Sequence, residues 1–128
     1  MAFQRYLVEF DTGTDLHGMD VTKAAQKAVK GAISHCCMCG MEELLHVENP
    51  AQAIRLEVKL GCPFPERVDV EAVKSALPPY SAVEVEVAPG GMTVRGLRVP
   101  AMGAGDTIVL VNAAITVFVD TDLVSLNS

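Results

Sequence analysis

The sequence feature that most restricts the fold is an uncharged run of twelve residues, Ile108 to Val119. Its odd-numbered positions carry only apolar side chains, whereas the even-numbered positions mix apolar residues with Asn112 and Thr116. Alternation with a period of two predicts a β-strand with one buried face. The run is too short for a membrane-spanning helix, which needs about 20 apolar residues. It therefore predicts a long core strand whose second, mixed face forms a subunit contact or a pocket wall.

Other segments along the chain have equally clear periodicity. Three predicted strands and a hairpin arm cover Phe3 to Phe10, Ala53 to Leu60, Ala82 to Ala88 and Met92 to Arg98. A helix with an alanine-rich apolar stripe is predicted from Val21 to about Cys37, and Asp20 is its N-cap. A second, short helix follows the cap residue Asp69, and Pro100 to Asp106 is expected to be a loop. The predicted order is β-α-β-α-β-β.

This order predicts a single α+β domain over residues 1–128, with two helices on one face of one sheet. The architecture is that of a ferredoxin-like or chorismate-mutase-like sandwich, a comparison of fold alone. The other sheet face combines charged residues with Leu7 and the even side of the last strand. Half of the residues are hydrophobic and the mean hydropathy is +0.31, more apolar surface than one small core needs. We expect oligomerisation through this sheet face into a homotrimer or hexamer.

Charge and composition exclude several classes of partner. The formal net charge is −6 and the pI about 4.9, whereas nucleic-acid binding needs a basic surface. The N-terminal segment carries Arg5 and Glu9 and lacks the apolar stretch of a secretory signal. With no membrane-spanning candidate either, we expect a cytoplasmic protein that binds neither nucleic acid nor membrane. Its four cysteines are then reduced thiols and not a disulfide framework.

Side chains capable of chemistry gather between the first strand and the first helix, in an expected loop. This segment contains Asp11, Asp15, Asp20, His17, Gly13 and Gly18. We expect His17 to act as the acid/base, with Asp15 orienting its ring. Asp11 would bind the ligand or tune the charge of the site. Gly13 and Gly18 would let a ligand reach backbone amides. In the alternative interpretation, Asp15 only closes a turn and His17 is a solvated loop residue.

Three more residues are candidate contacts for a small-molecule substrate. Thr22 lies in the first helical turn, where free amides and the helix dipole favour an anion. Arg95 on the hairpin arm could bind a carboxylate, and Asn112 lies on the mixed face of the last strand. The arginine could equally be solvated or paired with Glu84 or Glu86 of the neighbouring strand.

A metal site is a further alternative, although the main expectation is a site without a cofactor. Asp11, Asp15 and His17, with Asp20, offer oxygen and nitrogen ligands suited to a divalent metal such as Mn, Fe or Zn. No second histidine lies nearby in the sequence, so the set is incomplete for a closed zinc site.

The segment Cys36-Cys37-Met38-Cys39 is compatible with two functions, redox exchange and the binding of a soft metal ion. It lies at the C-terminal end of the predicted helix, where the dipole raises a thiol pKa, and redox pairs occupy the N-terminal end. The sequence therefore favours small buried side chains that close a helix, and Cys62 is also assigned to packing.

The motif Gly13-Thr14-Asp15-Leu16-His17-Gly18, continued by Asp20 to Ala25, resembles a known family. This family consists of conserved hypothetical proteins from bacteria and plants and is marked by GxGxDxHG near the N-terminus. Asp11 stands where the family motif has its first glycine. The resemblance implies no activity, because none is assigned to the family. More distantly, the acidic, glycine-rich loop is similar to the repeat unit of ring-opening amidohydrolases.

Together these features favour a small oligomeric enzyme that acts on a small polar metabolite by acid/base chemistry. The best-matching reactions are hydrolysis or isomerisation of a cyclic amide-like compound. The alternative is a non-catalytic module that binds a small molecule or a metal.

Overall fold

The computed structural model describes residues 2–102 and 105–126, so Gly103 and Ala104 of the expected loop lie outside it. The strands are β1 (Phe3–Asp15), β2 (Ile54–Cys62), β3 (Ala82–Pro89), β4 (Met92–Arg95) and β5 (Thr107–Asp120). The helices are α1 (Val21–Ser34), α2 (Cys39–Glu43), α3 (Pro50–Ala53) and α4 (Val70–Lys74), with 3-10 turns η1 (Pro65–Arg67) and η2 (Thr121–Leu123). The predicted α+β class with one sheet is confirmed. No helix in the described ranges is long and apolar enough to cross a membrane.

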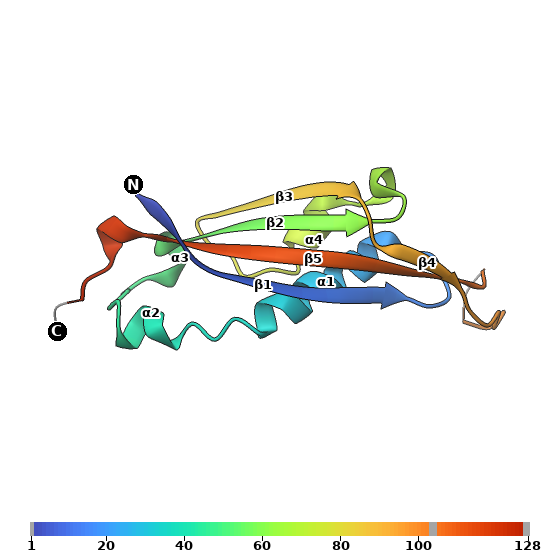
Figure 1. Ribbon diagram of the computed structural model, residues 1–128, viewed down its shortest axis with the longest axis horizontal. Coiled ribbons are helices and arrows are strands. Elements are labelled where there is room, and N and C mark those ends of the chain that lie inside the picture. Colours follow the sequence, from blue (N-terminus) through green and yellow to red (C-terminus); the bar gives the residue numbers. More distant parts are fainter. Residues whose placement is uncertain (1, 103–104, 127–128) are drawn as a thin grey trace.

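The strands form one sheet in the order β1-β5-β2-β3, and β4 pairs with β5 (Figure 1). The long alternating run forms the central strand β5, which is antiparallel to both β1 and β2. β3 is parallel to β2, because the chain between them crosses over through α4. The expected hairpin arm is β4, whose Met92 lies opposite Leu110 of β5.

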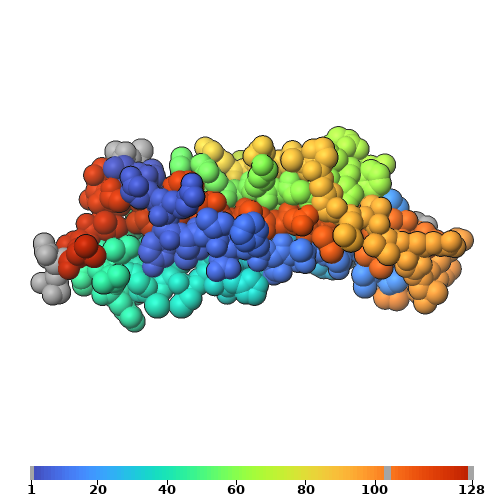
Figure 2. Space-filling model, in the orientation of Figure 1, coloured from blue at the N-terminus to red at the C-terminus, as the bar shows by residue number. Residues whose placement is uncertain are grey.

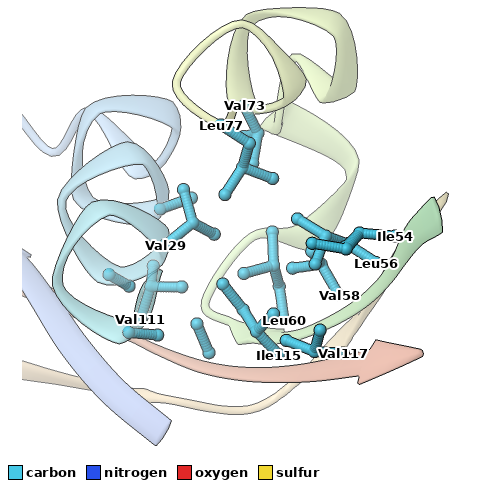
Figure 3. Packing of buried hydrophobic residues seen from close by; sticks show 14 of the residues in the cluster. Val29, Ile54, Leu56, Val58, Leu60, Val73, Leu77, Val111, Ile115 and Val117 are labelled. Atoms are coloured by element: carbon cyan, nitrogen blue, oxygen red, sulfur yellow. The ribbon is translucent and has the colours of Figure 1, made fainter. Parts of the chain in front are cut away.

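The helices cover one face of this sheet, and the core lies between the two layers (Figure 3). The odd-numbered residues of β5 and the even-numbered residues of β2 point into the core, as their alternation predicts. The apolar stripe of α1 is fully buried and consists largely of alanines: Val21, Ala24, Ala25, Ala28, Val29 and Ala32. Small side chains let α1 lie close against β1 and β5.

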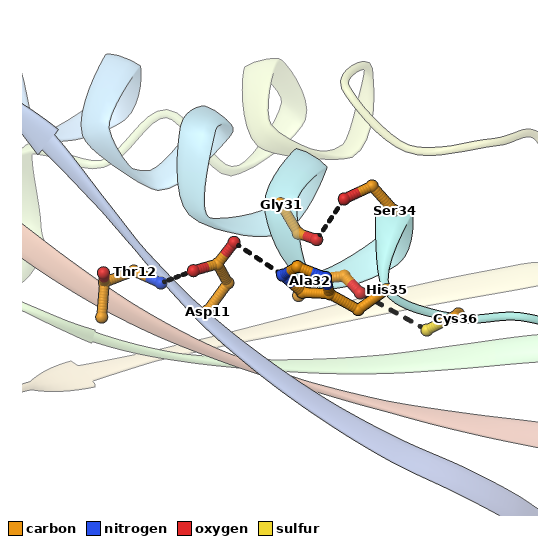
Figure 4. Close-up of polar contacts among 7 residues, drawn as sticks. All are labelled: Asp11, Thr12, Gly31, Ala32, Ser34, His35 and Cys36. Carbon is orange, nitrogen blue, oxygen red and sulfur yellow. Dashed lines mark hydrogen bonds and ion pairs between the residues drawn. The ribbon is translucent and has the colours of Figure 1, made fainter.

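The capping residues predicted from the sequence begin both main helices. The Asp20 carboxylate accepts from the Lys23 amide at 3.0 Å, and the Asp69 carboxylate accepts from the Ala72 amide at 3.2 Å. The predicted end of α1 at Cys37 is wrong, because the helix ends at Ser34. The Ser34 hydroxyl donates to the Gly31 carbonyl at 2.6 Å, a local bond that competes with continued helix (Figure 4).

Two expectations about β1 are wrong. The strand continues to Asp15 and not only to Phe10, because the residues from Asp11 onward pair with Ala113 to Val109 of β5. The expected loop is therefore mostly strand. Leu7 packs against the core and not on the open face, because the register shifts between Arg5 and Leu7.

The second face of the sheet is open, and no helix of the described ranges covers it. Figure 2 shows side chains of β1 (blue) and β5 (orange-red) uncovered on the face in view. Phe10 is 68% exposed there, and Met92 and Val94 of β4 are also exposed. Charged side chains of β2 and β3 complete this face, including Glu57, Glu84 and Lys59.

Candidate functional site

The connection from β1 to α1 is organised by the buried carboxylate of Asp15. Its Oδ2 atom accepts from the amides of Gly18 at 3.1 Å and Asp20 at 2.9 Å. Between them, Met19 adopts a left-handed backbone with φ of 51°. Asp15 therefore closes a turn through the backbone, as the alternative interpretation of the sequence held, and presents Asp20 as the cap of α1.

The imidazole of His17 is half-buried on the wall of a cavity of about 400 Å³. The cavity is lined by residues that include Asp15, Gly18, Lys23, Lys27 and Met102. His17 Nδ1 is buried and has no hydrogen-bond partner within the described residues. Within the described residues, the recorded hydrogen bonds of the Asp15 carboxylate come from backbone amides and none joins it to the His17 ring, so the expected Asp15–His17 pair is not seen.

The charges that line this cavity are unequally available to a ligand. The carboxylates of Asp15 and Asp20 already accept from backbone amides. Lys23 is exposed, and Lys27 donates from Nζ to the Thr14 carbonyl at 3.0 Å, which leaves further ammonium hydrogens free. The two carboxylates stay charged but have backbone partners, so the free donors of this cavity are ammonium hydrogens, which suit an anionic group on a small ligand. The i, i+4 spacing of the two lysines next to the cap places both beside this turn.

The two glycines of the motif have different roles. An ideal Cβ on Gly13 would collide with the Ala24 carbonyl and lie 2.6 Å from the Ala28 amide nitrogen. Gly13 therefore allows α1 to pack against β1, and its expected role in ligand access is wrong. Gly18 is exposed and borders the cavity, where an added Cβ would lie 3.2 Å from Asp15 Oδ2. This position is consistent with its expected place beside a ligand.

Asp11 lies apart from the cavity, four residues before Asp15 on the same strand and thus roughly 13 Å away. Its Oδ2 atom lies 3.3 Å from His35 Nε2 at the end of α1, and Oδ1 accepts from the Thr12 amide (Figure 4). Gly31 makes room for this carboxylate. The alternative metal set of Asp11, Asp15 and His17 is therefore not assembled. Within the described residues, no group of three His, Cys, Asp or Glu side chains could hold a metal.

The other expected ligand contacts do not line the cavity. Thr22 Oγ1 accepts from the Asp69 amide at 2.9 Å and so holds the start of α4. Arg95 is 88% exposed and pairs with Asp106 at 3.2 Å. Asn112 is exposed on the open sheet face.

Comparison with known proteins places the chain in a family. The family described as "Conserved hypothetical protein (Lin0512_fam)" matches residues 5–117. The chain belongs to this family. This match confirms the predicted resemblance to a family of conserved hypothetical proteins.

A solved structure has the same fold as the Lin0512 family chain. It is the crystal structure of an FtsZ-like protein of unknown function from Nostoc punctiforme, with a TM-score of 0.81 and 34% sequence identity. The match covers 94% of this chain and 98% of the Nostoc chain. No curated protein matches the sequence. These comparisons support the fold and bring no activity to the site.

Proposed function

We propose that the cavity at the start of α1 binds a small anionic metabolite and that His17 transfers a proton to or from it. Two observations carry this proposal: His17 lines the cavity, and its buried Nδ1 has no hydrogen-bond partner within the described residues. A buried polar atom without a partner is costly and is typical of a group that a ligand or reaction uses. Imidazole is also the side chain best suited to proton transfer near neutral pH.

The surrounding residues have distinct roles in this proposal. Lys23 and Lys27 bind the negative charge of the metabolite, and Gly18 lets it approach the turn. Asp15 keeps the turn rigid through its two backbone hydrogen bonds. His17 Nδ1 takes a proton either from a water that attacks the substrate or from a carbon acid. The reaction class we propose is therefore hydrolysis or isomerisation of a small polar, cyclic amide-like compound, without a cofactor.

A second candidate function is ligand binding without turnover. It is favoured by the observation that the carboxylate of Asp15 is occupied by backbone amides and does not orient the His17 ring. Both candidates predict binding of an anion, and they differ only in whether the bound compound is changed.

A substrate screen with three variants separates the two candidates. Purified protein is incubated with small cyclic amides and carboxylates, and products are detected by mass spectrometry. His17→Gln is expected to lower turnover by about 100-fold or more, the usual scale of acid/base catalysis. His35→Gln is the matched control, because this histidine lies outside the cavity, beside Asp11. Lys27→Gln is expected to weaken binding.

The binding arm uses inorganic phosphate as the probe and the ring nitrogens of His17 in NMR spectra as the readout. A shift of the His17 signals that saturates, and that Lys27→Gln weakens, supports the anion site. Binding without turnover of any screened compound favours the binding module. Turnover by His17→Gln at the wild-type rate would end the catalytic assignment.

We also propose that the chain forms a homo-oligomer, a trimer or hexamer, through its open sheet face. The support is the exposed apolar set on that face, which includes Phe10, Met92 and Val94. Apolar patches of this kind mark contact surfaces. Light scattering at micromolar concentration tests the proposal, and a monomer would contradict it.

A further inference from the structure

The segment between α1 and α2 brings two exposed thiols together. Cys37 and Cys39 are both exposed, and their sulfur atoms lie 3.7 Å apart. The sequence assigned these residues to buried packing, which is wrong for this pair. Packing does describe Cys62, which is buried, and partly Cys36, whose thiol donates to the Ala32 carbonyl at 3.5 Å (Figure 4).

We propose that Cys37 and Cys39 form a binding site for a soft monovalent metal ion, Cu(I). Two sulfurs bound about 2.3 Å from one metal ion lie at most about 4.6 Å apart. The sulfur separation of 3.7 Å is within this limit, so one ion can contact both thiolates. Exposure of both side chains gives an ion direct access to the site.

The small number of available ligands decides which metal the site takes. No set of three His, Cys, Asp or Glu side chains in the described ranges is arranged to hold a metal. Structural zinc is almost always four-coordinate, and calcium or magnesium needs oxygen ligands. Soft thiolate ligands suit Cu(I), zinc and iron–sulfur clusters, and of these zinc and the clusters use four protein ligands. A site with two thiolates therefore favours Cu(I) over Zn(II).

Binding replaces protons and involves no change of oxidation state. Two S–H bonds break, two Cu–S bonds form, and two protons leave to solvent while copper stays Cu(I). Copper competes with these protons, so affinity rises with pH.

This site is independent of the proposed function. Cys37 lies beyond the C-terminal end of α1 and His17 precedes its N-terminal end, so the 14-residue helix separates them by about 21 Å. Either proposal can fail without affecting the other.

The test is an anaerobic titration of the reduced protein with Cu(I) in competition with a chromophoric Cu(I) chelator. Wild-type protein is expected to hold one Cu(I), and Cys37→Ser and Cys39→Ser should each bind at least about 100-fold more weakly. Mutation of a residue that only supports a metal ligand lowers metal affinity by about 10–100-fold, so a loss of 100-fold or more indicates a direct ligand. X-ray absorption of the loaded protein should show sulfur neighbours around copper. Circular dichroism confirms that each variant is folded.

Cys36→Ser is the matched control, because it removes a neighbouring thiol that bonds to its own helix. Its affinity should fall by less than about 10-fold. The proposal is overturned if wild-type protein does not compete with the chelator, or if the Cys37 and Cys39 variants bind like wild type. An equal loss in Cys36→Ser would also overturn the assignment to this pair.

Discussion

Gly13→Ala gives the sharpest test of how the motif packs against α1. The new methyl group would collide with the Ala24 carbonyl and lie 2.6 Å from the Ala28 amide nitrogen. Both atoms belong to the backbone of buried alanines on the apolar stripe of α1, so neither can rotate away as a side chain would. The helix would have to move away from β1 at this close contact between the two layers.

The size of the effect follows from two opposing terms. Overpacking in a core costs about 1–3 kcal/mol, and contact with backbone on two sides places Gly13 near the upper end. Replacing glycine also reduces the entropy of the unfolded chain, which returns about 0.4–1 kcal/mol. The net loss of unfolding free energy is about 2–2.5 kcal/mol. For a domain of this size, that lowers the melting temperature by roughly 6–12 °C.

Urea and thermal unfolding monitored by circular dichroism measure this loss. Gly18→Ala is the matched control, since its methyl group would meet only Asp15 Oδ2, at 3.2 Å, on an exposed turn. Gly18→Ala should therefore change stability by no more than about 0.5 kcal/mol. A Gly13→Ala protein as stable as Gly18→Ala would refute the packing role of Gly13.

Two further predictions concern other parts of the helix layer and the core. Burial raises the pKa of the Cys62 thiol from 9.0 to about 11. Between these pH values, this thiol therefore ionises in the unfolded chain but not in the folded protein. This thiol should thus lower stability by up to about 2–3 kcal/mol as pH rises through this window. Chemical denaturation of Cys62→Ala should show a shallower slope, because burial also raises the pKa values of Cys36 and Tyr80. Gly31→Ala alone should change the free energy of unfolding very little. Alanine favours the helix, but its methyl group would displace the Asp11 carboxylate from His35, and the two effects offset each other. In an Asp11→Ala background it should stabilise by about 1 kcal/mol, and additive effects in this double-mutant cycle would contradict the contact.

Much of the fold was predictable because its strongest signals are local and periodic. The alternation in β2 and β5 matches their buried faces, and the caps Asp20 and Asp69 begin their helices as expected. The length of β1 was not predictable in the same way. Its Asp11–Asp15 stretch has no apolar alternation, and it is strand only because β5 extends far enough to pair with it. Long-range pairing of this kind overrides local preference.

The candidate site was predicted less well, because two partners were available to the same carboxylate. Asp15 could have bonded the His17 ring or the backbone amides after it, and the sequence permits both. The amides of Gly18 and Asp20 are held in place by the turn, and each needs a hydrogen-bond partner because it is partly buried. Positioning the His17 ring would instead cost side-chain entropy, so the carboxylate bonds the amides. The cysteine pair was missed for a related reason. Free cysteine is buried on average, but α1 ends before Cys37 and leaves it exposed.

The period of the strand separates packing residues from site residues within one short motif. Asp11, Gly13 and Asp15 alternate on β1, so all three point toward α1 and their substitution acts through the helix–sheet contact. His17 follows the last strand residue and is free of that alternation, so its ring can border the cavity. A change at Gly13 should therefore reduce stability without a specific effect on ligand binding. A change at His17 should weaken ligand binding and leave stability unchanged. Comparing the two variants by unfolding and by phosphate titration therefore separates the packing role of Gly13 from the binding role of His17.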